Sequence, residues 1–181
     1  MKKYFAIIFF ILFTNNTLAS IKSNIIENLL NIENLSFKFE QNTNGKIENG
    51  ECIIEYPKKI YCEYKIKKKL LVSNGNSLVI KTASSFYIYP IEKTPLNLLL
   101  DKDFLLKKLK KSEGKKMNNK FINYNFIEDD NKISLFFDKK SYNLIGWQTT
   151  DIYQNINTTF LSSINKNISI KKNLFKLPTQ K

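Results

Sequence analysis

The sequence predicts a mainly β fold with a helical cover: an open, incomplete antiparallel β-barrel of about ten to eleven strands, with helices closing its cavity. Between residues 37 and 100, short runs of alternating apolar and polar residues are separated by turn signals such as Asn44-Gly45 and Asn74-Gly75. Directly after them, Thr94-Pro95 opens the apolar segment Leu96–Leu100, which suits a helix lying on the sheet. No βαβ rhythm interrupts the strands, which indicates an antiparallel sheet.

The first 19 residues have the features of an export signal. Lys2 and Lys3 precede an apolar run at Tyr4–Phe13, and Thr17-Leu18-Ala19 offers small residues for a signal peptidase. We therefore expect cleavage after Ala19 and release into the periplasm. A retained membrane anchor is the alternative, but the apolar run is shorter than the ~20 residues that span a bilayer. Because Ser20 stands where a lipoprotein signal places cysteine, we expect the mature chain to carry no lipid. Residues 20–181 have a size suited to a single domain with a substantial core.

The composition is strongly basic, with a formal net charge of +13 and 29 basic residues. All of them are lysine, and the chain contains neither arginine nor histidine. A basic balance can indicate nucleic acid or an anionic membrane as partner. Nucleic acid is disfavoured here, because an exported chain rarely meets it and arginine, the usual bidentate reader, is absent. The lysines also fit plain AT-rich codon usage.

The elements can be placed in order from periodicity and turn signals. Apolar residues at helical spacing predict a helix over Ile21–Asn34, and Asp103–Lys111 is a second amphipathic segment. The polar stretch Lys111–Lys120 reads as an exposed loop. After a first strand around Phe37–Gln41, we expect strands at Lys46–Tyr56, Lys59–Ile66, Leu70–Ser73, Ser77–Thr82, Phe86–Tyr89, Phe121–Glu128, Lys132–Asp138, Asn143–Thr150, Ile152–Leu161 and Ile168–Ile170.

The two cysteines belong to one predicted hairpin. If the chain folds back about Pro57, Cys52 faces Cys62 on the apolar side, close enough for a disulfide. An oxidising compartment would allow that bond to form. Two buried free thiols, acting as small apolar side chains, are the alternative.

Residues able to carry out catalysis are missing. Without histidine the chain lacks the commonest base and metal ligand, and two cysteines alone do not make a zinc site. The neighbouring carboxylates Asp129-Asp130 and Asp101/Asp103 fall in predicted turns, where aspartate is common for backbone reasons. We therefore predict no catalytic residue, no metal, no cofactor and no enzymatic activity.

An ordered set of motifs resembles the periplasmic lipoprotein-carrier family LolA. The resemblance covers the order of elements in nearly the whole mature chain. Its most specific parts are Gln41 with Gly45 and Gly50, Tyr56-Pro57 with its hairpin, Leu71–Gly75, Thr94-Pro95-Leu96 with Leu98–Leu100, and the closing Phe175-Lys176-Leu177-Pro178.

The resemblance implies a non-enzymatic chaperone that binds the acyl chains of lipoproteins in its cavity. It implies delivery from an inner-membrane lipoprotein-releasing ABC transporter towards an outer-membrane acceptor, LolB-like or unknown, with the carrier expected to act as a monomer. One position departs from the family. Arginine commonly precedes the hairpin proline and is thought to bond the lid, whereas this chain has Tyr56. We expect Tyr56 to contact the lid through a single hydroxyl, with an ordinary core tyrosine as the alternative.

The apolar residues of the strands and covers form the expected cavity lining, although each taken singly could equally be core. They are Leu29, Leu30, Phe37, Phe39, Ile54, Ile60, Tyr64, Leu78, Ile80, Phe86, Ile88, Leu96, Leu99, Leu100 and Phe104.

Three other functions remain open. A lipid or glycolipid binder of the envelope could use the same fold without delivering lipoproteins. An interaction or stress-sensing module could share the half-barrel, although such modules usually belong to longer chains. A secreted hydrolase would need activity without histidine.

Overall fold

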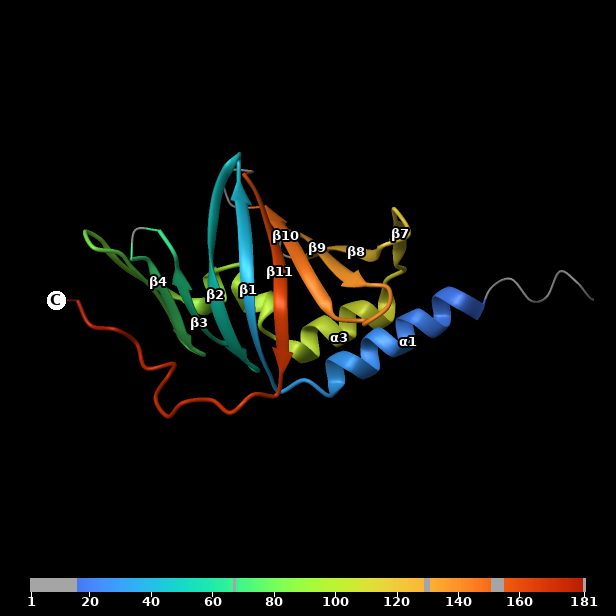
Figure 1. The fold of residues 1–181 in the computed structure, drawn as a ribbon, viewed down its shortest axis with the longest axis horizontal. Coiled ribbons are helices and arrows are strands. Elements are labelled where there is room, and N and C mark those ends of the chain that lie inside the picture. Colours follow the sequence, from blue (N-terminus) through green and yellow to red (C-terminus); the bar gives the residue numbers. More distant parts are fainter. Residues whose placement is uncertain (1–15, 67, 129–130, 151–154, 181) are drawn as a thin grey trace, which may run out of the picture.

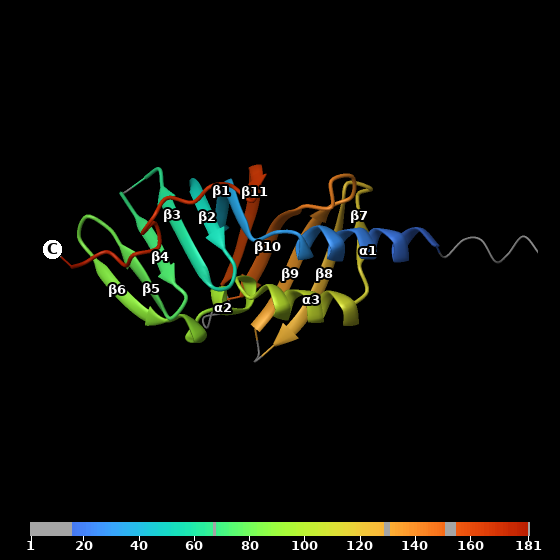
Figure 2. The same ribbon diagram turned by 90° about the horizontal axis from the view of Figure 1, so that it is seen from below.

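The computed structural model describes residues 16–66, 68–128, 131–150 and 155–180. Its centre is one curved antiparallel sheet of eleven strands that does not close, in the order β6-β5-β4-β3-β2-β1-β11-β10-β9-β8-β7. Figures 1 and 2 show this sheet bending around the helices, with β6 at one end and β7 at the other. The predicted open half-barrel is confirmed. Lys2, Lys3 and the run Tyr4–Phe13 lie outside the described residues.

The strand bounds agree with most of the expected segments. They are β1 (Asn34–Thr43), β2 (Lys46–Glu55), β3 (Lys59–Tyr64), β4 (Leu70–Asn74), β5 (Ser77–Lys81), β6 (Phe86–Pro90), β7 (Lys115–Met117), β8 (Phe121–Glu128), β9 (Asn131–Asp138), β10 (Leu144–Thr150) and β11 (Ile156–Lys166). The expected loop at residues 111–120 contains the short strand β7, because its backbone adds to the edge of β8 although its side chains are all exposed. The expected strand Ile168–Ile170 is wrong: β11 ends at Lys166, and the chain then leaves the sheet.

Two long helices pack together inside one half of the curved sheet. In α1 (Asn16–Leu30), Ile25 and Leu29 are buried one turn apart. This helix stops before the predicted end at Asn34, because Asn34 already pairs with Glu55 as the first residue of β1. In α3 (Lys102–Lys111), the Asp101 carboxylate accepts a hydrogen bond from the Phe104 N–H at 3.0 Å and so caps the helix.

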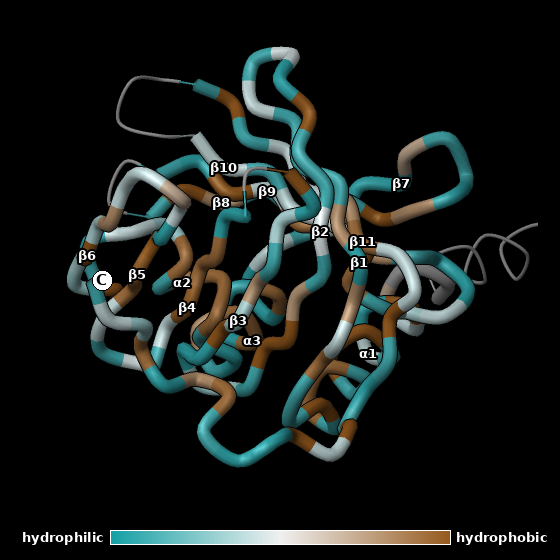
Figure 3. Tube along the Cα trace, turned by 60° about the vertical axis from the view of Figure 1, so that its left-hand side comes forward, coloured by the Kyte–Doolittle hydropathy of each residue, from teal (hydrophilic) through white to brown (hydrophobic). Residues whose placement is uncertain are grey.

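A shorter helical cover lies inside the other half. It consists of the 3-10 turn η2 (Ile91–Lys93) and the single helical turn α2 (Leu96–Leu99), with Pro95 at its N-terminus. In Figure 2, α2 lies between the strands of this half and α3. Figure 3 shows hydrophobic stretches of β4, α2 and α3 grouped within the curve of the sheet.

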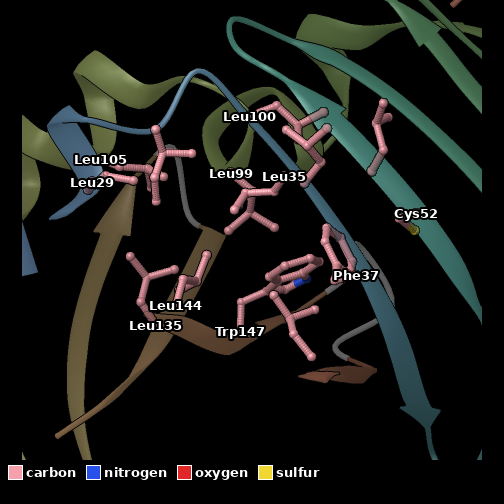
Figure 4. Close-up of a cluster of buried hydrophobic side chains, with 14 of the residues drawn as sticks. Leu29, Leu35, Phe37, Cys52, Leu99, Leu100, Leu105, Leu135, Leu144 and Trp147 are labelled. Atoms are coloured by element: carbon pink, nitrogen blue, oxygen red, sulfur yellow. The ribbon is translucent and has the colours of Figure 1, made fainter. Parts of the chain in front are cut away.

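The buried core runs along the inner face of the sheet. Leu105 and Leu109 of α3 and Leu29 of α1 pack with Leu135 and Leu144 of the later strands. Figure 4 shows how this cluster continues through Leu35, Leu99 and Leu100 to Phe37 and Trp147. The core therefore links the two halves of the sheet beneath the helices.

The hairpin of β2 and β3 has the register expected from its sequence. Cys52 lies opposite Cys62, with Ile54 opposite Ile60, and a disulfide joins the two cysteines. Both sulfurs lie on the inner, apolar face of the sheet, because their strand neighbours Ile54 and Ile60 are core residues. The bond ties two central strands together within the wall of the half-barrel.

The C-terminal tail crosses the outer, convex face. Asn34 fastens its start, since its amide donates to the Ile168 carbonyl and accepts from the Ile168 N–H at 2.8 Å. Figures 1 and 2 both show the tail running from the end of β11 past β2, β3 and β4. Further along, the Lys59 ammonium lies over the Phe175 ring, and Lys81 donates to the Thr179 carbonyl. The tail is thus a cover for the back of the sheet.

We predict that replacing both cysteines, Cys52→Ala with Cys62→Ala, lowers the free energy of unfolding by about 2–3 kcal/mol. The bond closes a loop of ten residues, which reduces the entropy of the unfolded chain by roughly that amount. Urea unfolding of oxidised protein, reduced protein and the double variant would measure the effect. Equal midpoints for all three would contradict it.

Candidate functional site

An apolar hollow of about 240 Å³ lies between the inner face of the sheet and α2. The concave wall and the cover contribute its lining, which consists of Phe37, Phe39, Gln41, Cys52, Ile60, Cys62, Tyr64, Leu71, Pro95, Leu96, Leu99, Trp147, Thr149, Asn157 and Thr159. In Figure 4, Phe37 and Trp147 lie close together on the strands, with Leu99 of α2 nearby. Their rings meet edge to face, with centroids 6.2 Å apart.

The polar groups around the hollow are uncharged or neutralised. The Tyr64 hydroxyl donates to Gln41 Oε1 at 3.3 Å, and burial, followed by the nearby Glu48 carboxylate, raises the pKa of Tyr64. Lys69 binds Glu48 at 2.9 Å and lies over the Tyr64 ring. No lysine, aspartate or glutamate is among the described residues that line the hollow. It therefore suits an apolar ligand with few hydrogen-bonding groups.

The structure brings part of the predicted lining together in this hollow. Phe37, Phe39, Ile60 and Tyr64 reach it from β1 and β3, and α2 adds Leu96 and Leu99. Others are core residues: Leu29, Ile54, Leu78 and Leu100 are buried in the main cluster, and Ile80 and Phe104 pack against it.

Two strand residues, Phe86 and Ile88, are not on the inner face as expected. The register pairs Phe86 with Lys81 and Ile88 with Val79, whereas Leu78 and Ile80 pair with Tyr89 and Tyr87. Four residues connect the strands, so even-numbered residues of β5 face odd-numbered residues of β6. A shift of one residue moves every side chain to the other face of a strand. The outer face is where Phe86 and Ile88 lie.

Leu30 also differs from the prediction. It is 51% exposed, because the buried stripe of α1 follows Ile25 and Leu29, and the next residue points about 100° away. Leu30 is therefore a useful control position outside the hollow.

Trp147, Leu71 and Thr149 were not predicted, although they line the hollow. The alternation of residues along β10 indicates that Trp147 and Thr149 share one face of the strand. Which face of the sheet this is depends on how β10 pairs with distant strands. That pairing places Trp147 opposite Thr159 of β11, and β11 lies next to β1. Leu71 follows from its pairing with Cys62.

Hydrogen bonds from the hairpin turn hold the end of α2. The Lys58 N–H donates to the Leu100 carbonyl at 2.8 Å, and the Lys58 carbonyl accepts from the buried Ser73 hydroxyl at 2.8 Å. The Lys58 ammonium lies 3.9 Å from the Asp101 carboxylate. A chain of contacts therefore joins β4, the turn at Pro57 and the cover.

Tyr56 lies next to the turn at Pro57, but the hydrogen bond to the end of α2 comes from the Lys58 N–H and not from Tyr56. Its side chain packs against the core, and it lines a surface pocket with Asp101 and Lys102. Burial raises the pKa of Tyr56, so the hydroxyl is neutral. Among the described residues that hydroxyl has no hydrogen-bond partner; a contact with the lid stays a prediction.

A larger groove of about 560 Å³ lies on the convex face, between the tail and β1, β2, β3 and β11. Charged and polar residues line much of it, including Lys38, Glu51, Glu63 and Lys171. Tyr61 donates a hydrogen bond to Glu63 there, and burial together with that contact raises the pKa of Tyr61 to about 12. An acyl chain would have to remove these groups from water, so the inner hollow is the better candidate site.

Within the described residues, no helix has both the length and the apolar character needed to cross a bilayer. The same part of the chain holds no group of three or more cysteine, aspartate or glutamate side chains placed to bind a metal ion.

The model of the family described as outer membrane lipoprotein carrier protein LolA matches residues 31–178. The chain belongs to the LolA family. The matched range begins just before β1 and reaches Pro178, so it includes the whole sheet, the cover and most of the tail.

Solved structures with a similar arrangement are only distantly related. The LolA superfamily protein NE2245 of Nitrosomonas europaea is 6% identical, with 88% of this chain and 97% of that chain aligned at a TM-score of 0.46. The lipoprotein LppX of Mycobacterium tuberculosis is 10% identical, with 87% of this chain and 100% of that chain aligned at a TM-score of 0.47. A DUF1329 family protein of Desulfovibrio piger is 6% identical, with 88% of this chain and 97% of that chain aligned at a TM-score of 0.44. Comparison with curated proteins gives no match.

We predict that Ser73→Ala loosens the cover. The substitution leaves the Lys58 carbonyl without its donor and should cost about 1–2 kcal/mol locally. Hydrogen exchange should then accelerate at the Lys58 N–H, which binds Leu100, and at the amides of α2. Ser77→Ala is the matched control, because the Ser77 hydroxyl makes no hydrogen bond within the described residues. If both variants exchange like the parent, Ser73 does not secure the cover.

Proposed function

We propose that this protein is a periplasmic, non-enzymatic carrier that holds the acyl chains of lipoproteins in the hollow beneath α2. It would receive them from an inner-membrane lipoprotein-releasing ABC transporter and deliver them to an outer-membrane acceptor. The proposal also takes residues 1–19 as a cleaved signal and residues 20–181 as one domain. Membership of the LolA family supports the class of cargo. The observation that carries the proposal is the apolar hollow closed by a short, separately held helix.

The size of the hollow favours a cover that moves. Ligand pockets usually enclose about 300–1,000 Å³, and the 240 Å³ found here falls below that range. Leu96 and Leu99 of α2 occupy the space that a ligand would need. In this closed state the cover shields the aromatic wall from water. Lifting α2 would enlarge the hollow and expose that wall to an acyl chain.

The energetics explain why such a carrier can both hold and release its cargo. A sixteen-carbon chain in water costs roughly 12 kcal/mol, at about 0.8 kcal/mol per CH₂ group. Binding recovers that cost, but it first requires the leucines of α2 to leave Phe37 and Trp147. The lost contacts offset part of the gain, so the net affinity is lower than the apolar area alone would give. Transfer to an acceptor then needs only a modest difference in affinity.

Trp147 provides a direct test, because it is the single tryptophan of the chain and lines the hollow. A fatty acid brominated on its acyl chain should quench at least half of the Trp147 emission on binding. The unbrominated fatty acid should leave most of the emission. Phe37→Leu keeps the wall apolar and should still permit quenching. Emission that stays constant with saturating brominated fatty acid would contradict binding in the hollow.

A pair of substitutions tests the cover itself. Leu96→Glu places a carboxylate against the hollow and should weaken binding of a fluorescent fatty acid tenfold or more, because the bound chain would desolvate that charge. Leu30→Glu is the control, with the same change of charge at an exposed leucine, and should stay within twofold of the parent. Equal affinities for both variants would place the ligand elsewhere.

The natural cargo decides between the carrier and its rivals. Protein purified from its native periplasm without detergent should bring acylated protein with it, detectable by intact mass spectrometry. Bound phospholipid or glycolipid without any acylated protein would favour the envelope lipid binder. An empty hollow together with a co-purified protein that lacks acyl chains would favour the sensing module.

A further inference from the structure

The two edges of the sheet are built very differently. The β7 edge consists of Lys115, Lys116 and Met117, all exposed, and lysines on an edge strand discourage pairing with other chains. The β6 edge has the sequence of residues 86–90, with no charged residue. Tyr87, Ile88 and Tyr89 are 51%, 58% and 42% exposed. Three consecutive large apolar side chains thus face solvent from both faces of one edge strand.

The hydrogen bonding between β5 and β6 determines which backbone groups of β6 point away from the sheet. The Ile91 N–H donates to the Asn76 carbonyl, and the Thr82 N–H donates to the Ser85 carbonyl. Bonded pairs alternate along an antiparallel ladder, so Tyr87 and Tyr89 bond to Ile80 and Leu78 of β5. The N–H and C=O groups of Phe86 and Ile88 therefore point away from the sheet. These N–H and C=O groups can form hydrogen bonds with the backbone of another extended strand that adds to the edge.

Side chains on both faces of β6 would enclose that added strand. Tyr87 and Tyr89 stack with centroids 6.4 Å apart on the inner face, and Ile88 lies on the outer face. An incoming strand alternates its own side chains, so every second one would meet the tyrosines and the others would meet Ile88. Pro90 has no N–H and limits the pairing to the residues before it.

A second copy of the same chain is a poor occupant. In a symmetric antiparallel pairing about Ile88, Phe86 would face Pro90, and the Phe86 carbonyl would find no donor. The chain is also strongly basic, with a formal net charge of +13 over the full sequence, and this opposes self-association. A five-residue strand is only about 17 Å long, far too short for the ~1,200 Å² that a stable dimer buries. These constraints favour a flexible partner segment that is neutral or acidic.

We propose that β6 is a docking edge for an extended, neutral or acidic segment of a partner protein, which adds to the sheet as a twelfth strand. This site is separate from the hollow and does not require that lipids bind there. The partner is recognised by its backbone and by alternating apolar side chains.

A synthetic peptide can serve as the probe. We choose residues 76–82, which contain β5, the natural neighbour of β6, with Lys81→Glu and blocked ends. Hydrogen exchange followed by NMR on the whole protein should show the amides of Phe86 and Ile88 protected tenfold or more at saturating peptide. The amides of Tyr87 and Tyr89, already bonded to β5, should change little. Protection appearing elsewhere, with none at Phe86 and Ile88, would overturn the proposal.

Matched variants separate backbone from side-chain recognition. Ile88→Pro removes the outward N–H while sparing the bonds to β5, and Ile88→Glu places a carboxylate on the edge that repels the acidic peptide. Each should weaken peptide binding at least tenfold. Met117→Glu makes the same change of charge on the β7 edge and should stay within twofold.

The peptide and the free protein supply the remaining controls. The same peptide N-methylated at alternate residues should lose binding to the unaltered protein, whatever the stability of the variants. Unchanged affinity for the methylated peptide or for both Ile88 variants would overturn the proposal. If the amides of Phe86 and Ile88 become protected from exchange as the protein concentration rises without peptide, the edge binds a second copy of the chain, and the proposal of a partner segment is overturned.

Discussion

The inner face of the sheet is apolar along nearly its whole width, and the chain has too little helix to cover it evenly. In the β8–β10 half, α1 and α3 fill the curve with closely packed leucines and isoleucines. In the other half, the described cover consists of the short turn η2 and the single turn of α2. A wall that is apolar but thinly covered leaves space beside Phe37 and Trp147. The hollow is thus a consequence of unequal cover over one continuous sheet.

That inequality also supports the proposal that α2 is the part of the cover that moves. Removing α3 would expose the main core, whose members Leu105 and Leu109 are almost fully buried. Lifting α2 uncovers a few leucines and breaks the bond between Lys58 and Leu100. The second change is far smaller, and a bound acyl chain can replace the lost apolar contacts. The two covers therefore differ in how much apolar area they bury, and α2 buries less than α3.

Local sequence signals predicted this fold well wherever contacts were local. Asn44-Gly45 and Asn74-Gly75 marked tight turns, and symmetry about Pro57 placed Cys52 opposite Cys62. The errors arose where adding or removing one loop residue moves the side chains of the next strand to the opposite face of the sheet. A loop of three residues at 83–85 would have put Phe86 and Ile88 inside, whereas the observed four put them outside. Trp147 was missed because β10 reaches the hollow only through β11, and that pairing leaves no local mark on the sequence.

The convex face supports the choice of the hollow, rather than the back of the sheet, as the proposed binding surface. Val72 and Val79 point outward from β4 and β5, yet each is 1% exposed. They belong to the face that the tail crosses, where Leu174 shares a groove with Ile53 and Tyr61. The tail is fastened at both ends, by Asn34 at Ile168 and by Lys81 at Thr179, so it acts as a fixed back cover. Phe175-Lys176-Leu177-Pro178 therefore serves the sheet, which needs apolar cover on both faces. On the concave side the cover is shorter, and the space beneath it has no charged residue in its described lining.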